Sequence, residues 1–399
     1  MAGEITLVAM ATWGELGNLL AAKRLARCLE TSADAPIRVI KAEDLFPRFA
    51  AIGAEIERLA KTRVSPAITY ERYMAYMAGL EAFFAPGFEA DGLPPVPLAT
   101  ELQPMAAFIR DERPALLAGT KGIISRTLLA ASRLAGVSVP LINFVTNEGL
   151  LTIPLHRSTS LPHHLVPFES GRQYLLREHG YASSQVRTVG RLVAFPGAMD
   201  AVMPLAEDGD LPIRIVIFSN RGGAPYLRPL LALAQRPEEI GVVFIGFNDP
   251  ELTQQARALI DRSPRLHGRV VDSLTQSQYL ACIRWLAEGD TSLLITKTGP
   301  NTMLEAAYFG VPQLVLNSGL PMEQWVAPFV SAHGFGMGFT EMDPLVETLT
   351  AWLDAPEEIR TRRQAARRFS AGLMNQDEAE RTIRAEFRRA LASVHEPAR

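Results

Sequence analysis

The 399-residue sequence has little cysteine, little excess charge of either sign and no long apolar run. Only Cys28 and Cys282 occur, in separate halves, which argues against a disulfide framework or a thiolate metal cluster and predicts two buried thiols. Lys and Arg total 40 against 43 Asp and Glu, so the positive excess that nucleic-acid binding requires is missing. No stretch approaches the roughly twenty apolar residues of a transmembrane helix, and Glu4 stands where a signal peptide has positive charge. We therefore expect a cytoplasmic protein with no transmembrane segment and no nucleic-acid partner.

Two nucleotide-binding motifs are also absent. The run SNRGGAP after one apolar segment lacks the G-x-x-x-x-G-K-[ST] of a P-loop, so ATP hydrolysis has no support. The run TWGELGN at 12–18 falls short of G-x-G-x-x-G, which disfavours a nicotinamide cofactor. The D-x-D at 208–210 lies in a hinge-like segment and follows no predicted strand, and the adjacent His163 and His164 have no third ligand at zinc-like spacing. The sequence therefore predicts no metal site and no bound cofactor.

The sequence does contain short apolar runs rich in β-branched residues, which alternate with longer helical patterns. This alternation is typical of parallel sheets covered by helices on both faces. The expected strands are 5–10, 37–40, 115–118, 140–145, 165–167 and 185–189, followed by 213–218, 241–246, 268–271, 292–296 and 313–316. The prediction is an α/β protein with two doubly wound parallel sheets, in domains at 1–195 and 212–372 joined by a hinge at 196–211. Residues 356–391 read as a charged helical tail.

Ligands of open parallel sheets bind at the carboxyl ends of the strands, where the strand order reverses. The most informative segment there is Leu293–Gln324, which reads as a buried strand, a turn, a helix that begins at Asn301 or Thr302, and a second strand. The first turn of such a helix presents unpaired N–H groups and a positive dipole end, which suit a diphosphate. Glu305, one turn into that helix, could accept hydrogen bonds from two ribose hydroxyls, or it could be an ordinary first-turn acid.

A second informative loop follows the strand at 213–218. In Ser219-Asn220-Arg221-Gly222-Gly223 the glycines let the backbone approach a ligand closely, and Arg221 could neutralise a leaving diphosphate. The alternative is a tight connection with no ligand.

These motifs carry a resemblance to a known family. The run TKTGPNTMLEAAYFGVPQLVLNSGLPMEQ, the loop FSNRGGAP and the run FIGFNDPEL resemble the donor domain of GT-B glycosyltransferases, in particular family 28. That family includes the lipid II-forming N-acetylglucosaminyltransferase and enzymes related to monogalactosyldiacylglycerol synthase. The resemblance implies two Rossmann-like domains that face a central cleft, with acceptor binding in 1–195, donor binding in 212–372, and a C-terminal helix in 373–399 that crosses back to the first domain.

The resemblance also implies the donor site. Glu305 would bind the ribose, main-chain groups near Val271 would read the base, and Glu323 with Gln324 would face the sugar hydroxyls. The diphosphate would lie among residues of the two loops: Ser219, Asn220, Arg221, Gly222, Gly223, Thr298, Gly299, Pro300, Asn301 and Thr302. The implied reaction inverts the anomeric centre and needs no metal. Its co-substrate is a nucleotide sugar, for which a UDP-sugar is preferred over a dTDP-sugar.

The catalytic positions depart from the family pattern. Asn18 stands where the first glycine-rich loop ends in histidine, and Asn147 stands where the diacylglycerol branch has an aspartate. A carboxamide is not a base, so Glu148, Glu15 and His156 remain as candidates. We prefer Glu148, since partial burial could raise its pKa, although a surface-turn role has similar weight.

The acceptor side is less determined. Trp13 could stack on an acceptor or pack against the first helix. The acceptor would be a hydroxyl or amine of a small natural product or of a lipid. An apolar cluster at 73–84 leaves peripheral membrane contact open, but a core role is favoured there. Two other functions stay open, a nucleotide-sugar epimerase of the same architecture and a catalytically silent binding partner.

Overall fold

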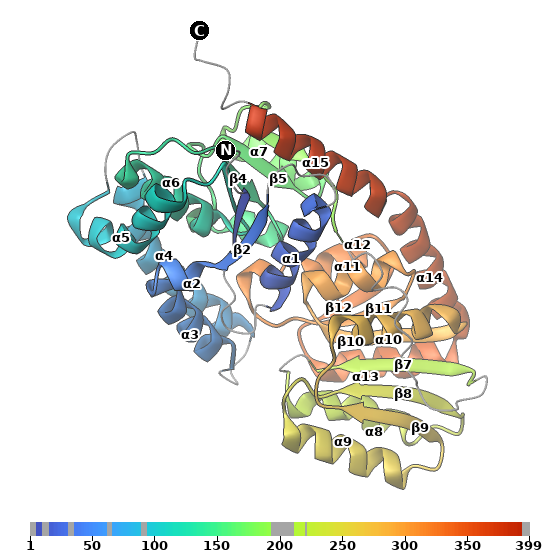
Figure 1. Cartoon of the computed structure of the whole chain (residues 1–399). Coiled ribbons are helices and arrows are strands. Elements are labelled where there is room, and N and C mark those ends of the chain that lie inside the picture. Colours follow the sequence, from blue (N-terminus) through green and yellow to red (C-terminus); the bar gives the residue numbers. More distant parts are fainter. Residues whose placement is uncertain are drawn as a thin grey trace. The chain divides into compact units, whose positions relative to one another are not determined.

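The structure is a computed structural model that describes residues 5–9, 16–30, 36–61, 66–88, 94–192, 211–219 and 222–392 (Figure 1). The chain forms two compact units, the first made of residues 1–192 and 374–399 and the second of residues 193–373. The expected hinge at 196–211 lies outside the described residues, apart from Leu211.

The first unit is built on a six-stranded sheet of order β2-β1-β3-β4-β5-β6 in which every neighbouring pair is parallel. Its strands are β1 (Ile5–Ala9), β2 (Ile37–Lys41), β3 (Leu116–Gly119), β4 (Leu141–Phe144), β5 (His163–Val166) and β6 (Val186–Thr188). Its helices are α1 (Leu16–Glu30), α2 (Ala42–Leu45), α3 (Arg48–Lys61), α4 (Pro66–Phe88), α5 (Val96–Glu112), α6 (Gly122–Ala135), α7 (Glu169–His179) and α15 (Gln376–Ala392), with 3-10 turns η1 (Glu148–Thr152) and η2 (Pro154–His156). The strand order reverses between β1 and β3.

The C-terminal helix α15 belongs to this first unit. Its buried residues Ile383, Phe387 and Ala390 share one apolar cluster with α1, β3 and β4. The Arg384 guanidinium donates a 2.8 Å hydrogen bond to the Cys28 carbonyl of α1. The last helix of the chain therefore completes the core of the first unit.

The second unit holds a six-stranded parallel sheet of order β12-β11-β10-β7-β8-β9 (Figure 1). Its strands are β7 (Ile213–Phe218), β8 (Ile240–Ile245), β9 (Leu266–Val271), β10 (Thr291–Lys297), β11 (Gln313–Leu316) and β12 (Gly336–Phe339). Its helices are α8 (Leu227–Leu233), α9 (Pro250–Arg262), α10 (Gln276–Glu288), α11 (Pro300–Tyr308), α12 (Val326–Ala332), α13 (Met342–Asp354) and α14 (Pro356–Ala371), with 3-10 turns η4 (Ala224–Tyr226) and η5 (Pro321–Glu323). The expected α/β fold with two doubly wound parallel sheets is confirmed.

The two faces of the second sheet bury different helices. Ile215, Ile217 and Ile295 lie in a cluster with α8, α9 and α13, whereas Val216 and Leu294 lie in a cluster with α10 and α11. This alternation follows the two-residue period of a strand. It assigns each side chain at the strand ends to one face or the other.

The expected strands all occur, with ends that shift by up to two residues, but β12 was missed. Its sequence, GMGF, contains no β-branched residue and so carries no strand pattern. A Cβ at Gly336 would lie 2.2 Å from the Gln313 carbonyl oxygen, and one at Gly338 would lie 2.4 Å from the Ala327 Cβ. The glycines are required by close packing, which the sequence pattern does not reveal.

Three smaller expectations are tested by burial and length. Cys28 and Cys282 are free and buried, as expected. In the apolar cluster at 73–84, Tyr73, Met77 and Phe84 are buried, which confirms a core role for them. None of the described helices combines the length and hydropathy that a bilayer crossing demands.

Candidate functional site

The strand order of the second sheet reverses between β7 and β10, and both strands end at the same level. Phe218 of β7 lies opposite Thr296 of β10 in the parallel register. The loop that begins at Ser219 and the turn that begins at Thr298 therefore start side by side. This is the place where open α/β sheets bind their ligands.

The loop after β7 is tight. The Ser219 hydroxyl is fully buried, 3.1 Å from the Ile245 carbonyl oxygen and 3.0 Å from that of Gly246, so it ties β7 to β8. The Gly222 N–H donates to the Ser219 carbonyl over 2.6 Å, and a Cβ at Gly222 would lie 2.0 Å from the ring of Tyr226. Gly223 has a φ of 70°, which favours glycine. The predicted ligand residues Asn220 and Arg221 lie outside the described residues.

The turn after β10 leads directly into α11. The helix begins at Pro300, slightly before the predicted start, and the N-cap Gly299 provides no side-chain cap. Thr298 is buried, and its N–H donates to the Leu316 carbonyl over 3.0 Å, which holds the turn beside β11. Asn301 and Thr302 lie in the first turn of α11, and the first-turn N–H groups of an α-helix point toward its N-terminal end. The start of α11 therefore offers amide donors and a positive dipole end at the switch point.

Glu305 lies on the face of the sheet that α10 and α11 cover. Its side chain is buried, at 6% exposure. Burial raises the pKa of Tyr279 of α10, and the charge of Glu305 raises it further. Phe218, Phe247 and Tyr279 form a ring cluster on the same side, with centroid distances of 5.7 Å and 5.6 Å from Phe218. A buried carboxylate thus stands beside aromatic rings at this end of the sheet.

Glu323 forms an ion pair with Lys297. Lys297 is a residue of this site that the sequence did not predict. Lys297 ends β10, where the strand alternation places it on the face covered by α8 and α13, opposite to that of Glu305. Its ammonium donates to the Glu323 carboxylate over 2.6 Å and 2.9 Å, and the side chains are 18% and 11% exposed. The lysine immediately before the Thr298-Gly299 turn was a signal that could have been used.

Two other residues predicted for the donor site, Val271 and Gln324, lie at the ends of β9 and η5. The Val271 carbonyl at the end of β9 accepts a 2.9 Å hydrogen bond from the Gly246 N–H, so it fixes the loop after β8. In that loop Phe247 and Asn248 both have positive φ, 55° and 61°. Gln324 is half-buried and follows Glu323 at the end of η5.

In the first unit the residues around the β1–β3 reversal are described only in part. Trp13 and Glu15, in the loop after β1, lie outside the described residues, as does the side chain of Asn18, whose backbone belongs to α1. Asn147 is the N-cap of η1, and its side-chain oxygen accepts a 2.9 Å hydrogen bond from the Gly149 N–H.

Glu148 begins η1, and its carboxylate points to the start of α7. Its carboxylate accepts 3.1 Å hydrogen bonds from the Gly171 N–H and the Ser170 hydroxyl. Burial raises the pKa of Glu148 to about 7, against the lowering effect of these hydrogen bonds and of the Arg191 charge. The group is therefore a carboxyl that changes protonation near neutral pH and also caps a helix.

His156 is buried at the start of α6. Its Nδ1 accepts a 3.3 Å hydrogen bond from the Ile123 N–H, which leaves the proton of the neutral ring on Nε2. Burial lowers the pKa of His156 well below its usual range, and the charges of Lys121 and Arg126 lower it further. This histidine is therefore neutral, and its contact is with the helix.

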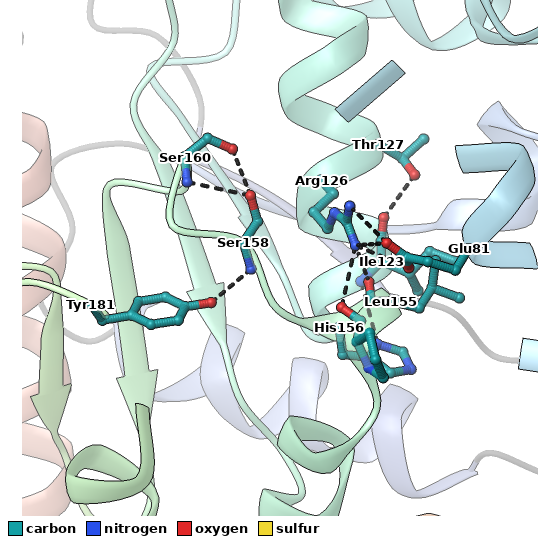
Figure 2. A network of polar contacts seen from close by, with 10 residues as sticks. Glu81, Ile123, Arg126, Thr127, Leu155, His156, Ser158, Ser160 and Tyr181 are labelled. Carbon is teal, nitrogen blue, oxygen red and sulfur yellow. Dashed lines mark hydrogen bonds and ion pairs between the residues drawn. The ribbon is translucent and has the colours of Figure 1, made fainter. Parts of the chain in front are cut away.

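Arg126 of α6 holds the turn that carries His156. Figure 2 shows its guanidinium beside Glu81 of α4 and the Leu155 carbonyl, which accepts a 3.0 Å hydrogen bond from it. The Pro154 carbonyl accepts a second hydrogen bond, at 3.3 Å. A buried guanidinium needs such partners, because an unpaired charge is costly in the interior. The network fixes η2 against α4 and α6.

Among the described residues, no three His, Cys, Asp or Glu side chains are arranged to hold a metal ion.

Solved structures resemble this chain over nearly its full length. MurG from Acinetobacter baumannii matches with a TM-score of 0.58 and 14% identity, over 97% of this chain and 100% of that chain. The glycosyltransferase VinC in complex with dTDP matches with a TM-score of 0.56 and 16% identity, over 98% and 100%. The UDP-GlcNAc 2-epimerase from Neisseria meningitidis bound to UDP-GlcNAc matches with a TM-score of 0.55 and 14% identity, over 98% and 100%. No family model and no curated protein matches the sequence. These likenesses establish the GT-B fold.

Proposed function

We propose that this protein is an inverting glycosyltransferase that moves a sugar from a nucleoside diphosphate sugar to a hydroxyl or amine of an acceptor. The proposed donor is a UDP-sugar. For the acceptor, a small soluble molecule is preferred over a lipid. The fold it shares with VinC and MurG, the first described in complex with dTDP, supports a nucleotide-sugar ligand.

The observation that carries this proposal is the placement of two buried carboxylates on opposite faces of the second sheet. Glu305 lies on the side of α10, and Glu323 lies on the side of Lys297 and Tyr226. The start of α11 lies between them at the strand ends. A nucleotide sugar has a matching order of polar groups: ribose hydroxyls, a dianionic diphosphate, and sugar hydroxyls.

The proposed chemistry needs a base for the acceptor proton and groups that stabilise the leaving diphosphate. The acceptor oxygen attacks the anomeric carbon, the bond from that carbon to the diphosphate oxygen breaks, and the acceptor proton passes to the Glu148 carboxylate. The amide groups at the start of α11, and Arg221 in the loop after β7, would stabilise the diphosphate as it leaves. No metal ion has a part in this scheme.

A donor screen tests the proposal. Calorimetry with UDP, dTDP and a panel of UDP-sugars, with EDTA and separately with magnesium, should give binding of UDP and of at least one UDP-sugar under both conditions. Transfer to pooled soluble and lipid acceptors is then followed by mass spectrometry, and the anomeric configuration by NMR. Binding that requires magnesium would contradict the metal-independent scheme, and absence of any nucleotide binding would contradict the whole proposal.

A nucleotide-sugar epimerase is the second candidate, because the fold is also that of the UDP-GlcNAc 2-epimerase. An epimerase needs no acceptor. Incubation of the protein with each UDP-sugar alone should leave the sugar unchanged if the transferase proposal is right, and a new sugar in the NMR spectrum would favour the epimerase.

A further inference from the structure

We propose that Lys297 is a positioning residue for selection of the donor sugar: it holds the Glu323 carboxylate in the orientation that accepts a sugar hydroxyl. This inference rests on the proposed function and adds the residue that would control its sugar subsite.

The two residues belong to a closed ring of contacts at the ends of β10 and β11. Lys297 donates to both carboxylate oxygens of Glu323, at 2.6 Å and 2.9 Å. The Ser318 hydroxyl donates to Glu323 Oε2 over 2.5 Å. Thr298 Oγ1 accepts a 3.1 Å hydrogen bond from the Ser318 N–H and lies 3.3 Å from Ser318 Oγ. Since Lys297 and Thr298 are neighbours in the chain, the ring closes on the turn that precedes α11.

This ring leaves acceptor capacity on one carboxylate oxygen. A carboxylate offers about four lone-pair positions. The ammonium uses one on each oxygen, and Ser318 uses a second on Oε2, so the remaining position is on Oε1. The Lys297 ammonium has three N–H groups, and its contact with the two carboxylate oxygens uses two of them. One acceptor and one cationic donor side by side match a sugar hydroxyl next to a diphosphate.

The buried phenol of Tyr226, in the η4 turn that follows the loop after β7, lies within the electrostatic influence of this carboxylate. The Tyr226 hydroxyl is buried and has no hydrogen-bond partner among the described residues. Burial raises the pKa of this phenol, and the Glu323 charge raises it further. Gly222 packs directly on the Tyr226 ring. The printed hydrogen bonds to the Glu323 carboxylate come from two segments of the switch point, the end of β10 at Lys297 and the loop after β11 at Ser318.

Stability alone is a poor reason for this ion pair. A mostly buried ion pair is often no more stabilising than a well-packed apolar pair of the same size, because both charges lose their hydration. Its position at the carboxyl ends of the central strands, with part of each side chain exposed, fits ligand recognition better.

The test compares UDP with the UDP-sugars that the wild-type protein binds, drawn from UDP-glucose, UDP-galactose and UDP-GlcNAc, by calorimetry. Lys297→Met should weaken the best UDP-sugar by roughly tenfold or more and leave UDP within about threefold, because UDP has no sugar for Glu323 to bind. Lys297→Arg should restore a large part of the lost affinity, since Arg also pairs with a carboxylate. Arg265→Met is the matched control: it removes an exposed ion pair with Glu239 at the opposite edge of the same sheet, and both affinities should stay unchanged.

A double variant separates positioning from general damage. If Lys297 acts through Glu323, Lys297→Met should add little to the loss of UDP-sugar affinity caused by Glu323→Gln. Equal loss of UDP and UDP-sugar affinity in Lys297→Met, or no loss of either, would overturn the inference while the proposed function stands. A wild-type protein that binds neither UDP nor any UDP-sugar would instead overturn the proposed function, and the inference with it.

Discussion

At the scale of single residues, burial determines the chemistry of the carboxylates. Glu305 is buried and Glu148 is half-buried, and their surroundings differ. Glu148 accepts hydrogen bonds from the start of α7, and desolvation still raises its pKa to about 7. Glu305 lies one turn into α11 beside Tyr279. One carboxyl is thus suited to proton transfer, and the other to a fixed contact at the proposed nucleotide site.

Glu305→Gln should weaken binding of UDP. The substitution keeps the shape of the side chain but removes the charge, and a hydrogen bond to a charged group contributes about 1.5–3 kcal/mol, so we expect roughly 10- to 100-fold lower affinity by calorimetry. Glu347→Gln on the exposed face of α13 is the control and should bind UDP as the wild type does. Unchanged UDP affinity in Glu305→Gln would remove Glu305 from the nucleotide site.

Glu148 should give the protein a pH-dependent stability. Its folded pKa of about 7 lies above the usual 4.5, so between these values the folded state holds a proton that the unfolded chain has released. The stabilisation from this proton is complete below pH 4.5 and is lost as the pH rises through 7, in total about 3 kcal/mol. Gln does not titrate, so Glu148→Gln should not lose this stabilisation. In urea unfolding, its free energy of unfolding minus that of the wild type should therefore rise by about this amount from pH 4.5 to about pH 8. Glu178→Gln on the exposed side of α7 should show no such trend, and parallel curves for Glu148→Gln and the wild type would contradict the assigned pKa.

The same carboxyl should control the rate if it is the base. The proposed transfer should then increase with pH and level off above about pH 7, and Glu148→Gln should lower kcat/KM by roughly 100-fold or more. Full activity of Glu148→Gln, measured with the acceptor found in the screen, would mean that the base is another residue.

At the scale of elements, two helix starts of the first unit are stabilised by side chains from elsewhere in the chain. The starts of α6 and α7 lack side-chain caps of their own, and His156 and Glu148 supply them from the segment after β4. The start of α11 has no side-chain cap either, and it lies at the switch point where a diphosphate could take that place. In the first unit, side chains from the segment after β4 therefore connect that segment to the starts of α6 and α7.

Two glycines within helices should respond to alanine with opposite signs. A Cβ at Gly171 in α7 would lie 2.4 Å from Glu148 Oε1, whereas a Cβ at Gly79 in α4 would meet nothing within 4 Å. Gly79→Ala should stabilise the protein by about 0.5–1 kcal/mol through the helix propensity of alanine. Gly171→Ala should destabilise it by about 1–3 kcal/mol, because the carboxylate must leave the helix N–H groups. Thermal and urea unfolding measure both, and stabilisation by Gly171→Ala would show that the carboxylate moves at little cost.

At the scale of the whole molecule, the chain makes two units whose cores are separate clusters of residues. The first unit needs the last helix of the chain, since Ile383 and Phe387 lie among α1, β3 and β4. The proposed nucleotide site belongs to the second unit alone.

Phe387→Ala and UDP should therefore act on different units. Loss of this fully buried ring should cost about 3–5 kcal/mol in the first unit. UDP should stabilise only the second unit, by an amount that rises with its concentration. Hydrogen exchange followed by mass spectrometry should show faster exchange in the first unit of the variant and UDP protection in 211–373. Loss of UDP binding in Phe387→Ala would mean that the second unit does not fold or bind by itself.

The sequence by itself determined the α/β class, the tandem sheets and most strand positions, because these follow from local alternation of apolar and polar residues. It also identified the loops at the carboxyl ends of β7 and β10, since glycines and a helix start are local signals. Only the tertiary structure revealed β12, whose glycines are set by contacts with Gln313 and Ala327. Only the structure paired Lys297 with Glu323, 26 residues apart, and directed Glu148 to the start of α7. The reason is physical: a hydrogen bond or ion pair depends on the positions of two side chains in space, and local sequence constrains only the conformation of each segment.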